Sequence, residues 1–203
     1  MSRPGEILVL NRRRGMARIS DDHRDGGMII DVTSKGEMPW RRFSPFFPHG
    51  GIPVPYFPGR TAASVEGIWQ GLKRFENEDC VDPSYFDLDT MRDLKRTSRG
   101  RGRSGMPRGR VLGHQRGADS DVLLDYVSAR RAIYLPSYRW VLTLRLHDEV
   151  KALRDTARTH TLVLVDYTTN GDVTATDRPL SHAALIRAYL LDRWPEEAEP
   201  GNK

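Results

Sequence analysis

The sequence contains a single cysteine and no long apolar run, and each of these absences excludes a class of protein. Cys80 has no partner for an internal disulfide, so a disulfide-stapled secreted domain is excluded and a reducing compartment is expected. The longest apolar runs, such as 162–165, are far shorter than the roughly 20 residues that cross a bilayer. The N-terminus also lacks the apolar stretch of a signal peptide. We therefore expect a cytoplasmic protein without a membrane partner.

The common catalytic and nucleotide-binding signatures are absent as well. The sequence has no G-x-G-x-x-G, no Walker A lysine loop, no G-x-S-x-G and no H-E-x-x-H. Its six histidines are scattered without the spacing of metal ligands, and paired C-x-x-C motifs are lacking. We therefore predict neither a metal nor a cofactor.

The size and composition of the chain are those of one domain with a modest core. Of its 203 residues, 38% are hydrophobic and 29% are charged, which leaves much of the chain as solvated loop. We predict a single domain over residues 1–194, followed by a disordered polar tail over 195–203. The predicted fold class is α+β, mostly helical with a few short strands.

The net charge of +5 is concentrated in one segment. Nine Lys or Arg residues lie between positions 92 and 116 against a single acid, Asp93, and six glycines are interspersed from 95 to 117. Two interpretations stay open for residues 96–117. The segment is a mobile, solvated basic loop, or it contacts the phosphates of DNA or RNA without reading their sequence.

Apolar periodicity predicts the regular elements. Strands are expected at 6–10, 28–32 and 161–166, and helices at 61–77, 119–131, 138–156 and 179–194. The strand at 161–166 is a continuous apolar run of the kind buried on both faces, and it ends in Asp166. Ligand groups often gather at such strand ends in α/β folds, so Asp166 is either a site residue or a structural hydrogen-bonding group.

Residues 37–60 contain six prolines and three glycines with aromatic residues between them, so no helix can run through this segment. Aromatic side chains are costly to expose together in a loop. We expect them to form an ordered wall, packed on the core or around a ligand.

The segment from Thr61 to Asn77 predicts an amphipathic helix that Thr61 caps. At 100° per residue, Glu66, Gln70 and Lys73 fall on one narrow stripe beside the apolar stripe that contains Trp69. The plain interpretation is an exposed polar stripe with weak side-chain contacts. The functional interpretation places these groups at the rim of a pocket.

Two consecutive motifs carry a family resemblance. Residues 42–48 (RFSPFFP) and 64–75 (SVEGIWQGLKRF) resemble the N-terminal signature of the NADAR (YbiA-like) family. That signature is a Ser-Asn-Phe-type loop and then a helix of the form Ser/Thr-x-Glu-His-x-x-Gln-x-x-Lys-Phe. Gly67 stands where the family usually has His, and Arg74 separates Lys73 from Phe75. Weaker similarities follow at 109–113, 138–140, 162–166 and 180–190.

The resemblance implies a NADAR-like fold and cleavage of an N-glycosidic bond in a nucleotide, an ADP-ribosylated nucleic acid or a modified base. The breaking bond develops positive charge on the sugar, which a carboxylate can stabilise. The catalytic candidates are Glu66, Lys73 and Asp166. The substrate-binding candidates are Arg42, Phe43, Ser44, Trp69, Gln70, Arg116 and Trp140.

The expected partner is a nucleotide or an ADP-ribose-like ligand, with DNA or RNA held through residues 96–117. Two alternatives stay open. One is a non-catalytic nucleic-acid-binding protein that uses the basic loop, and the other is a sensor that binds a nucleotide without cleaving it.

Overall fold

The computed structural model describes residues 5–78, 80–97, 107–117 and 120–198. By their internal contacts the residues form two compact units. Unit 1 combines 1–44 with 142–195, and unit 2 combines 45–141 with 196–203. Each unit is treated by itself, and the prediction of a single domain over 1–194 stays a prediction.

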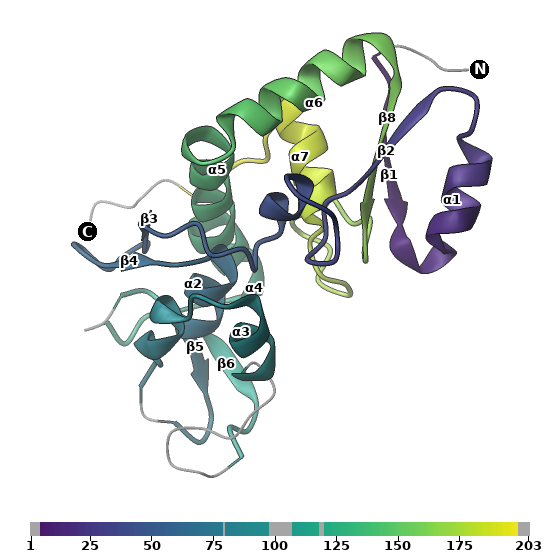
Figure 1. Cartoon of the computed structure of the whole chain (residues 1–203). Helices are drawn as coiled ribbons and strands as arrows, with labels where there is room; N and C mark the ends of the chain where they lie inside the picture. Colours follow the sequence, from purple (N-terminus) through teal and green to yellow (C-terminus); the bar gives the residue numbers. More distant parts are fainter. Residues whose placement is uncertain (1–4, 79, 98–106, 118–119, 199–203) are drawn as a thin grey trace. The chain divides into compact units, whose positions relative to one another are not determined.

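Unit 1 is built around a three-stranded parallel sheet in the order β1-β8-β2 (Figure 1). Its strands are β1 (Ile7–Asn11), β2 (Gly27–Asp31) and β8 (Thr161–Asp166). The three predicted strands are therefore confirmed to within one residue. β8 is buried along its whole length because it pairs on both edges, which explains its uninterrupted apolar sequence.

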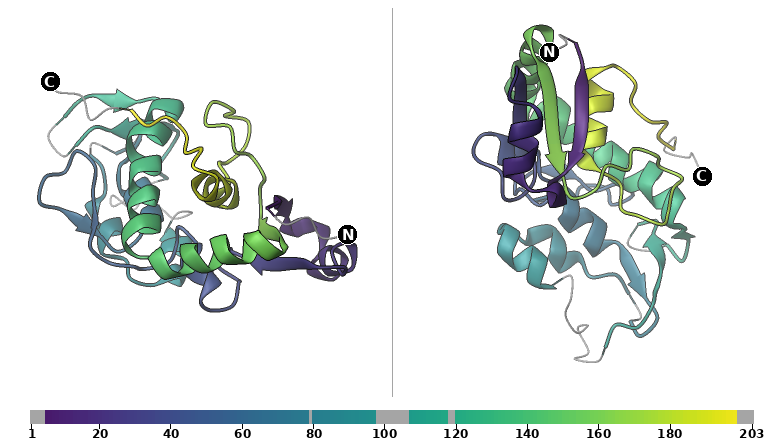
Figure 2. Two further views of the ribbon diagram at one scale, coloured as in Figure 1. Left: turned by 90° about the horizontal axis from the view of Figure 1, so that it is seen from above. Right: turned by 90° about the vertical axis from the view of Figure 1, so that its right-hand side faces the viewer.

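Helices cover both faces of this sheet. The helical elements of unit 1 are η1 (Arg12–Arg14), α1 (Met16–Asp22), η2 (Trp40–Phe43), α6 (His147–Thr159) and α7 (His182–Leu190). Ile19 of α1 packs on Val163 and Val165, on one face of β8. Because side chains alternate along a strand, Asp166 points to the opposite face, where α7 packs (Figure 2).

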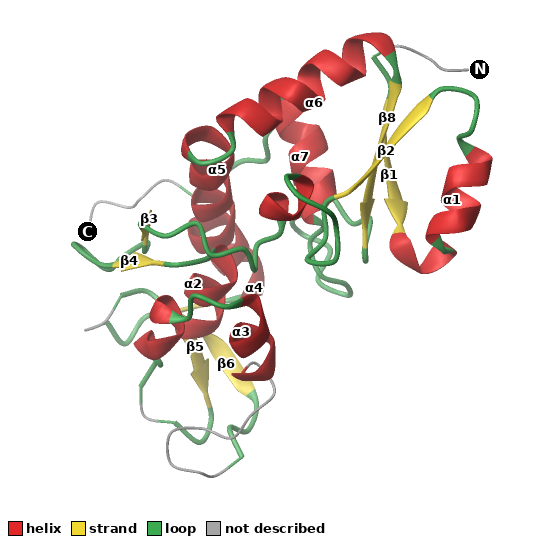
Figure 3. Cartoon of the chain, in the orientation of Figure 1, coloured by secondary structure: helices red, strands yellow, loops and turns green. Residues whose placement is uncertain are grey.

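Unit 2 consists of short helices and short antiparallel strands joined by loops (Figure 3). Its strands are β3 (Ile52–Pro53), β4 (Thr61–Ala62), β5 (Lys73–Phe75), β6 (Val111–Gln115) and β7 (Leu123–Leu124). Its helical elements are α2 (Val65–Gly71), η3 (Pro83–Asp87), α3 (Met91–Thr97), α4 (Tyr126–Ala129), the π-helical turn η4 (Arg130–Tyr134) and α5 (Leu135–Leu144), which continues past the unit boundary.

The helix predicted over Thr61–Asn77 is shorter than expected. Thr61 lies in β4, and α2 begins after Ser64, whose side-chain oxygen accepts a hydrogen bond from the Gly67 amide at 3.0 Å. The helix ends at Gly71 because Lys73 starts a strand that pairs with β6. The expectation that Thr61 is the cap is therefore wrong.

The helices predicted over 119–131 and 138–156 have other boundaries in the structure, because the chain stays helical through Pro136. The chain is helical from Tyr126 through η4 to Leu144, although helices were expected over 119–131 and 138–156. Proline lacks an amide hydrogen and crowds the carbonyl four residues earlier. The wider π turn precedes it, with the Leu135 amide bonded to the Arg130 carbonyl. α6 then begins separately at His147, and α7 is shorter than the predicted 179–194.

The basic segment 96–117 is only partly a loop. Residues 96–97 belong to α3 and residues 111–115 form β6, so the expectation of one continuous loop is wrong. Residues 98–106 lie outside the described residues. In the predicted tail, Ala198 donates its amide hydrogen to the Arg131 carbonyl and Glu197 pairs with Arg139, and the disorder of 195–203 stays a prediction.

The predicted α+β class is confirmed: helices predominate, and the sheets are small. In the parts of the chain that the structure describes, no helix is both long and apolar enough to span a bilayer.

Candidate active site

The candidate site in unit 2 is built on α2, which packs closely against η3. A Cβ atom added at Gly67 would lie 2.6 Å from the carbonyl oxygen of Tyr85, and one added at Gly71 would overlap the Phe86 ring. The two glycines are four residues apart and thus lie on the same face of the helix. They allow the two segments to approach, and they fix the position of α2.

A continuous hydrogen-bonded chain joins Glu66 and Gln70 of α2 to Lys73 of β5. Gln70 donates from Nε2 to Glu66 Oε1 at 2.5 Å, and its Oε1 accepts from Lys73 Nζ at 2.9 Å. Lys73 belongs to β5 and not to the helix, yet it reaches the helix end. The predicted grouping of Glu66, Gln70 and Lys73 is therefore present, with Gln70 orienting both charged groups.

Burial moves the two charged groups toward their neutral forms. It raises the pKa of Glu66, although the Gln70 hydrogen bond and the charge of Lys73 oppose the rise. Burial also lowers the pKa of Lys73, with help from the charge of Arg108 and against the charge of Glu66. An acid with a raised pKa and an amine with a lowered pKa thus lie at the two ends of Gln70.

His114 joins this cluster, although no sequence pattern predicts its position there. The β5–β6 pairing places His114 directly opposite Lys73, and the His114 ring centroid lies 3.8 Å from that of Trp69. Burial and the charge of Lys73 lower the pKa of His114 to about 3. The imidazole is therefore neutral at physiological pH.

Trp69 was predicted as a wall for a base, but its contacts favour a core role. Its side chain is 9% exposed. His114 lies against the ring, and Tyr126 and Tyr134 contact it in edge-on geometry. Lys73 Nζ lies 6.0 Å from the ring centroid. Trp69 therefore forms the apolar side of the Lys73 environment.

Two arginines of the basic segment, Arg108 and Arg116, lie over aromatic rings of unit 2. Arg108 donates to the Tyr85 hydroxyl at 2.5 Å and lies over the rings of Phe75 and Tyr85. Arg116 lies over the Tyr56 ring at 5.0 Å. Trp140, another predicted substrate contact, is half-buried on α5.

The other predicted site residues belong to unit 1. Arg42 pairs with Glu149 of α6 and donates to the Arg145 carbonyl at 2.8 Å. Phe43 is fully buried and stacks with Trp40, and Ser44 is buried beside it in sequence. For Phe43, these contacts favour packing on the core over contact with a ligand.

Asp166 is 3% exposed, and its oxygens already accept hydrogen bonds. Ser181 Oγ donates to Oδ2 at 2.7 Å, and the Tyr167 amide donates to Oδ1 at 2.6 Å. These contacts favour the structural interpretation of Asp166. The structure thus brings together Glu66, Gln70, Lys73 and Trp69 in unit 2, whereas Arg42, Phe43, Ser44 and Asp166 lie in unit 1.

Within the described ranges, no group of three or more His, Cys, Asp or Glu side chains is arranged to hold a metal ion. No curated protein and no solved structure matches the chain. A model of the family of unknown function DUF6939 matches residues 11–186, which includes most of both units. The chain therefore belongs to the DUF6939 family.

Proposed function

We propose that the chain is an N-glycosidase that acts on a nucleotide, an ADP-ribosylated nucleic acid or a modified base. The observation that carries this proposal is the hydrogen-bonded chain Glu66–Gln70–Lys73 in a half-buried setting. We also propose a cytoplasmic location, which the single cysteine supports.

Glu66 supplies acid or electrostatic catalysis in this proposal. In hydrolysis, water adds to the sugar C1′, the N–C1′ bond breaks, and the departing nitrogen takes up a proton. Because the pKa of Glu66 is raised, a larger fraction of the carboxyl holds a proton for that nitrogen. In its ionised form it stabilises the positive charge that develops on the sugar.

Lys73 acts on the sugar or on its phosphate. Its lowered pKa increases the fraction of neutral amine, which can attack C1′ of the ring-opened sugar and form an imine with loss of water. As an ammonium ion it binds a phosphate. Gln70 holds Lys73 through its side-chain oxygen and Glu66 through its nitrogen, so both groups keep a fixed orientation.

The resemblance to the NADAR family supports the proposal because it covers the same residues. The departure at Gly67 has a physical reason, since the Tyr85 carbonyl occupies the space that a His side chain would need. The fold that we propose is accordingly a divergent NADAR-like one in which the segment after the helix turns into β5 at Lys73.

The experiment incubates wild type, Glu66→Gln and Lys73→Met with NAD, ADP-ribose, riboflavin-pathway intermediates, and ADP-ribosylated or base-modified DNA and RNA. Mass spectrometry then detects released base or sugar. We expect product from wild type and a loss of about 10²- to 10⁴-fold in Glu66→Gln. Glu37→Gln, at an exposed position of unit 1, is the matched control and retains activity.

Three other outcomes separate the alternatives. Identical traces from wild type and Glu66→Gln contradict the glycosidase proposal. Salt-dependent binding of DNA or RNA that survives both substitutions, with no product, indicates a nucleic-acid-binding protein. Tight nucleotide binding without turnover indicates a sensor.

A further inference from the structure

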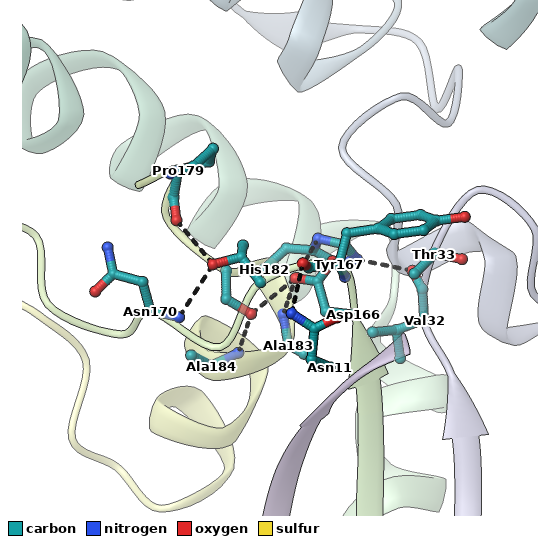
Figure 4. A network of polar contacts seen from close by, with 12 residues as sticks. Asn11, Val32, Thr33, Asp166, Tyr167, Asn170, Pro179, His182, Ala183 and Ala184 are labelled. Carbon is teal, nitrogen blue, oxygen red and sulfur yellow. Dashed lines mark hydrogen bonds and ion pairs between the residues drawn. The ribbon is translucent and has the colours of Figure 1, made fainter. Parts of the chain in front are cut away.

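The buried carboxylate of Asp166, at the C-terminal end of β8, faces the first turn of α7 (Figure 4). Besides the Ser181 hydroxyl, His182 Nδ1 lies 3.0 Å from Asp166 Oδ2, and the Ala183 amide donates to the same oxygen at 3.4 Å. Ser181 also caps α7, because its oxygen accepts from the Ala184 amide at 3.2 Å. The start of the helix is therefore bonded directly to the end of the central strand.

The second ring nitrogen of His182 faces β2. Its Nε2 lies 2.9 Å from the carbonyl oxygen of Val32, the residue after β2. A carbonyl oxygen only accepts hydrogen bonds, so Nε2 carries a hydrogen. The ionised Asp166 carboxylate also only accepts, so Nδ1 carries a hydrogen as well. Only the imidazolium form has both hydrogens. The contacts of His182 are therefore those of a positively charged ring.

The charges around His182 agree with this assignment. Burial lowers the pKa of His182, but Asp166, the Val32 carbonyl and Asp31 of β2 together raise it. Burial likewise raises the pKa of Asp166, but His182, the Ser181 hydroxyl and the Tyr167 amide together lower it. Asp31 is itself paired with Arg12 of η1 at 2.8 Å. The two partners thus hold opposite charges over the same pH range.

We propose that His182 and Asp166 form a buried, proton-dependent latch that joins β8, α7 and the segment after β2. When the ring loses one proton, its single remaining N–H serves either the Asp166 carboxylate or the Val32 carbonyl, a nitrogen lone pair faces the other oxygen, and the ion pair with Asp166 is lost. The Ser181 hydroxyl and the Ala183 amide then hold the start of α7 on Asp166 without the ion pair, so the first turn opens more readily. This inference concerns unit 1 and does not depend on the N-glycosidase proposal.

The latch also holds the base of the loop between β8 and α7. Asn11 donates from Nδ2 to the Tyr167 carbonyl at 2.9 Å, at the start of the loop. The Ser181 amide donates to the Asn170 carbonyl at 2.8 Å, at its end. Opening of the latch should therefore loosen residues 167–181 together with the first turn of α7.

The pH range follows from the directions of the shifts. The folded-state pKa of His182 is above 6.5, so its contribution is complete below pH 6.5 and is lost as the pH rises through the folded pKa. The folded-state pKa of Asp166 is below 3.8, so its contribution is present above pH 3.8 and is lost as the pH falls through the folded pKa. The latch is strongest between pH 3.8 and 6.5.

The test measures amide hydrogen exchange of the full chain from pH 5 to 9, expressed as protection factors so that the intrinsic pH dependence is removed. We expect protection of the Ala183 and Leu185 amides to fall by up to about tenfold per pH unit above 6.5, because opening releases one proton. His182→Gln and Asp166→Asn should abolish this slope. His147→Gln, at an exposed position of α6, should retain it.

Nuclear magnetic resonance of the His182 ring in wild type gives a second readout that requires no variant. We expect both ring nitrogens to be protonated at pH 6.5 and the titration midpoint to lie above 6.5. A midpoint at or below 6.5 overturns the latch, as does a slope that survives in His182→Gln. If the variants do not fold, the wild-type titration decides alone.

Discussion

At the scale of single residues, Glu66 and Lys73 show how burial shifts the pKa values of two oppositely charged groups. Each side chain alone would be a surface charge on a short helix or strand. Both lose solvation, with Lys73 lying beside Trp69 and His114, and this burial raises the pKa of Glu66 and lowers the pKa of Lys73. Gln70 connects them without adding charge.

The titration of Lys73 is the direct test of this arrangement. We expect Lys73 to titrate below 10.5, and to titrate at a still lower pH in Glu66→Gln, because the carboxylate that favours the ammonium form is removed. Arg108→Gln should raise the pKa of Lys73, because a repelling charge is removed. Carbon-13 shifts of the lysine side chains measure all three values.

A Lys73 that titrates at or above 10.5 in wild type would refute the burial argument, and with it the imine route proposed for Lys73.

At the scale of elements, α2 is defined by its ends. Ser64 satisfies an amide of the first turn, and Gly67 and Gly71 let the helix pack on η3. The apolar stripe that predicted a longer helix continues through Leu72 and Phe75, but Phe75 belongs to β5. An apolar spacing of three residues does not distinguish a helix from a helix followed by a strand.

Removal of the cap tests where the helix begins. Ser64→Ala should lower the free energy of unfolding by about 1 kcal/mol, because the Gly67 amide loses its buried acceptor. Thr61→Ala, at the position predicted from sequence as the cap, should change it by less than about 0.5 kcal/mol because Thr61 is exposed in β4. Urea denaturation measures both, and equal losses would contradict this assignment of the cap.

At the scale of the whole molecule, the sheet of unit 1 requires β8, a strand that lies late in the sequence. β8 lies between β1 and β2, so neither of the two N-terminal strands has a sheet partner until residues 161–166 are in place. Leu164 is central in this arrangement, opposite Val9 on one side and Ile30 on the other.

Truncation of Leu164 should therefore disrupt all three strands. We expect Leu164→Ala to lower the free energy of unfolding by roughly 2–5 kcal/mol, since the side chain is fully buried. Leu144→Ala, at a position that is 59% exposed, should cost less than about 0.5 kcal/mol. Hydrogen exchange should show the loss of protection in β1 and β2 as well as in β8. Loss confined to β8 would show that the sheet does not unfold cooperatively.

The sequence by itself determined the three strands of unit 1 and the spacing that places Glu66 beside Gln70. The strands and the Glu66–Gln70 contact follow from local rules, because a continuous apolar run is a buried strand and residues four apart on a helix are neighbours. Lys73 reaches Gln70 from β5, which those rules did not predict. Membership of the α+β class followed from the same patterns.

Only the tertiary structure decided what surrounds these residues. His114 reaches Lys73 through strand pairing, and His182 reaches Val32 across most of the chain. Neither contact has a local signature, because each depends on which distant segments close on one another. For Asp166, the sequence predicted the position at the end of a strand. Its partners at the start of α7 depend on the packing of that helix on the sheet.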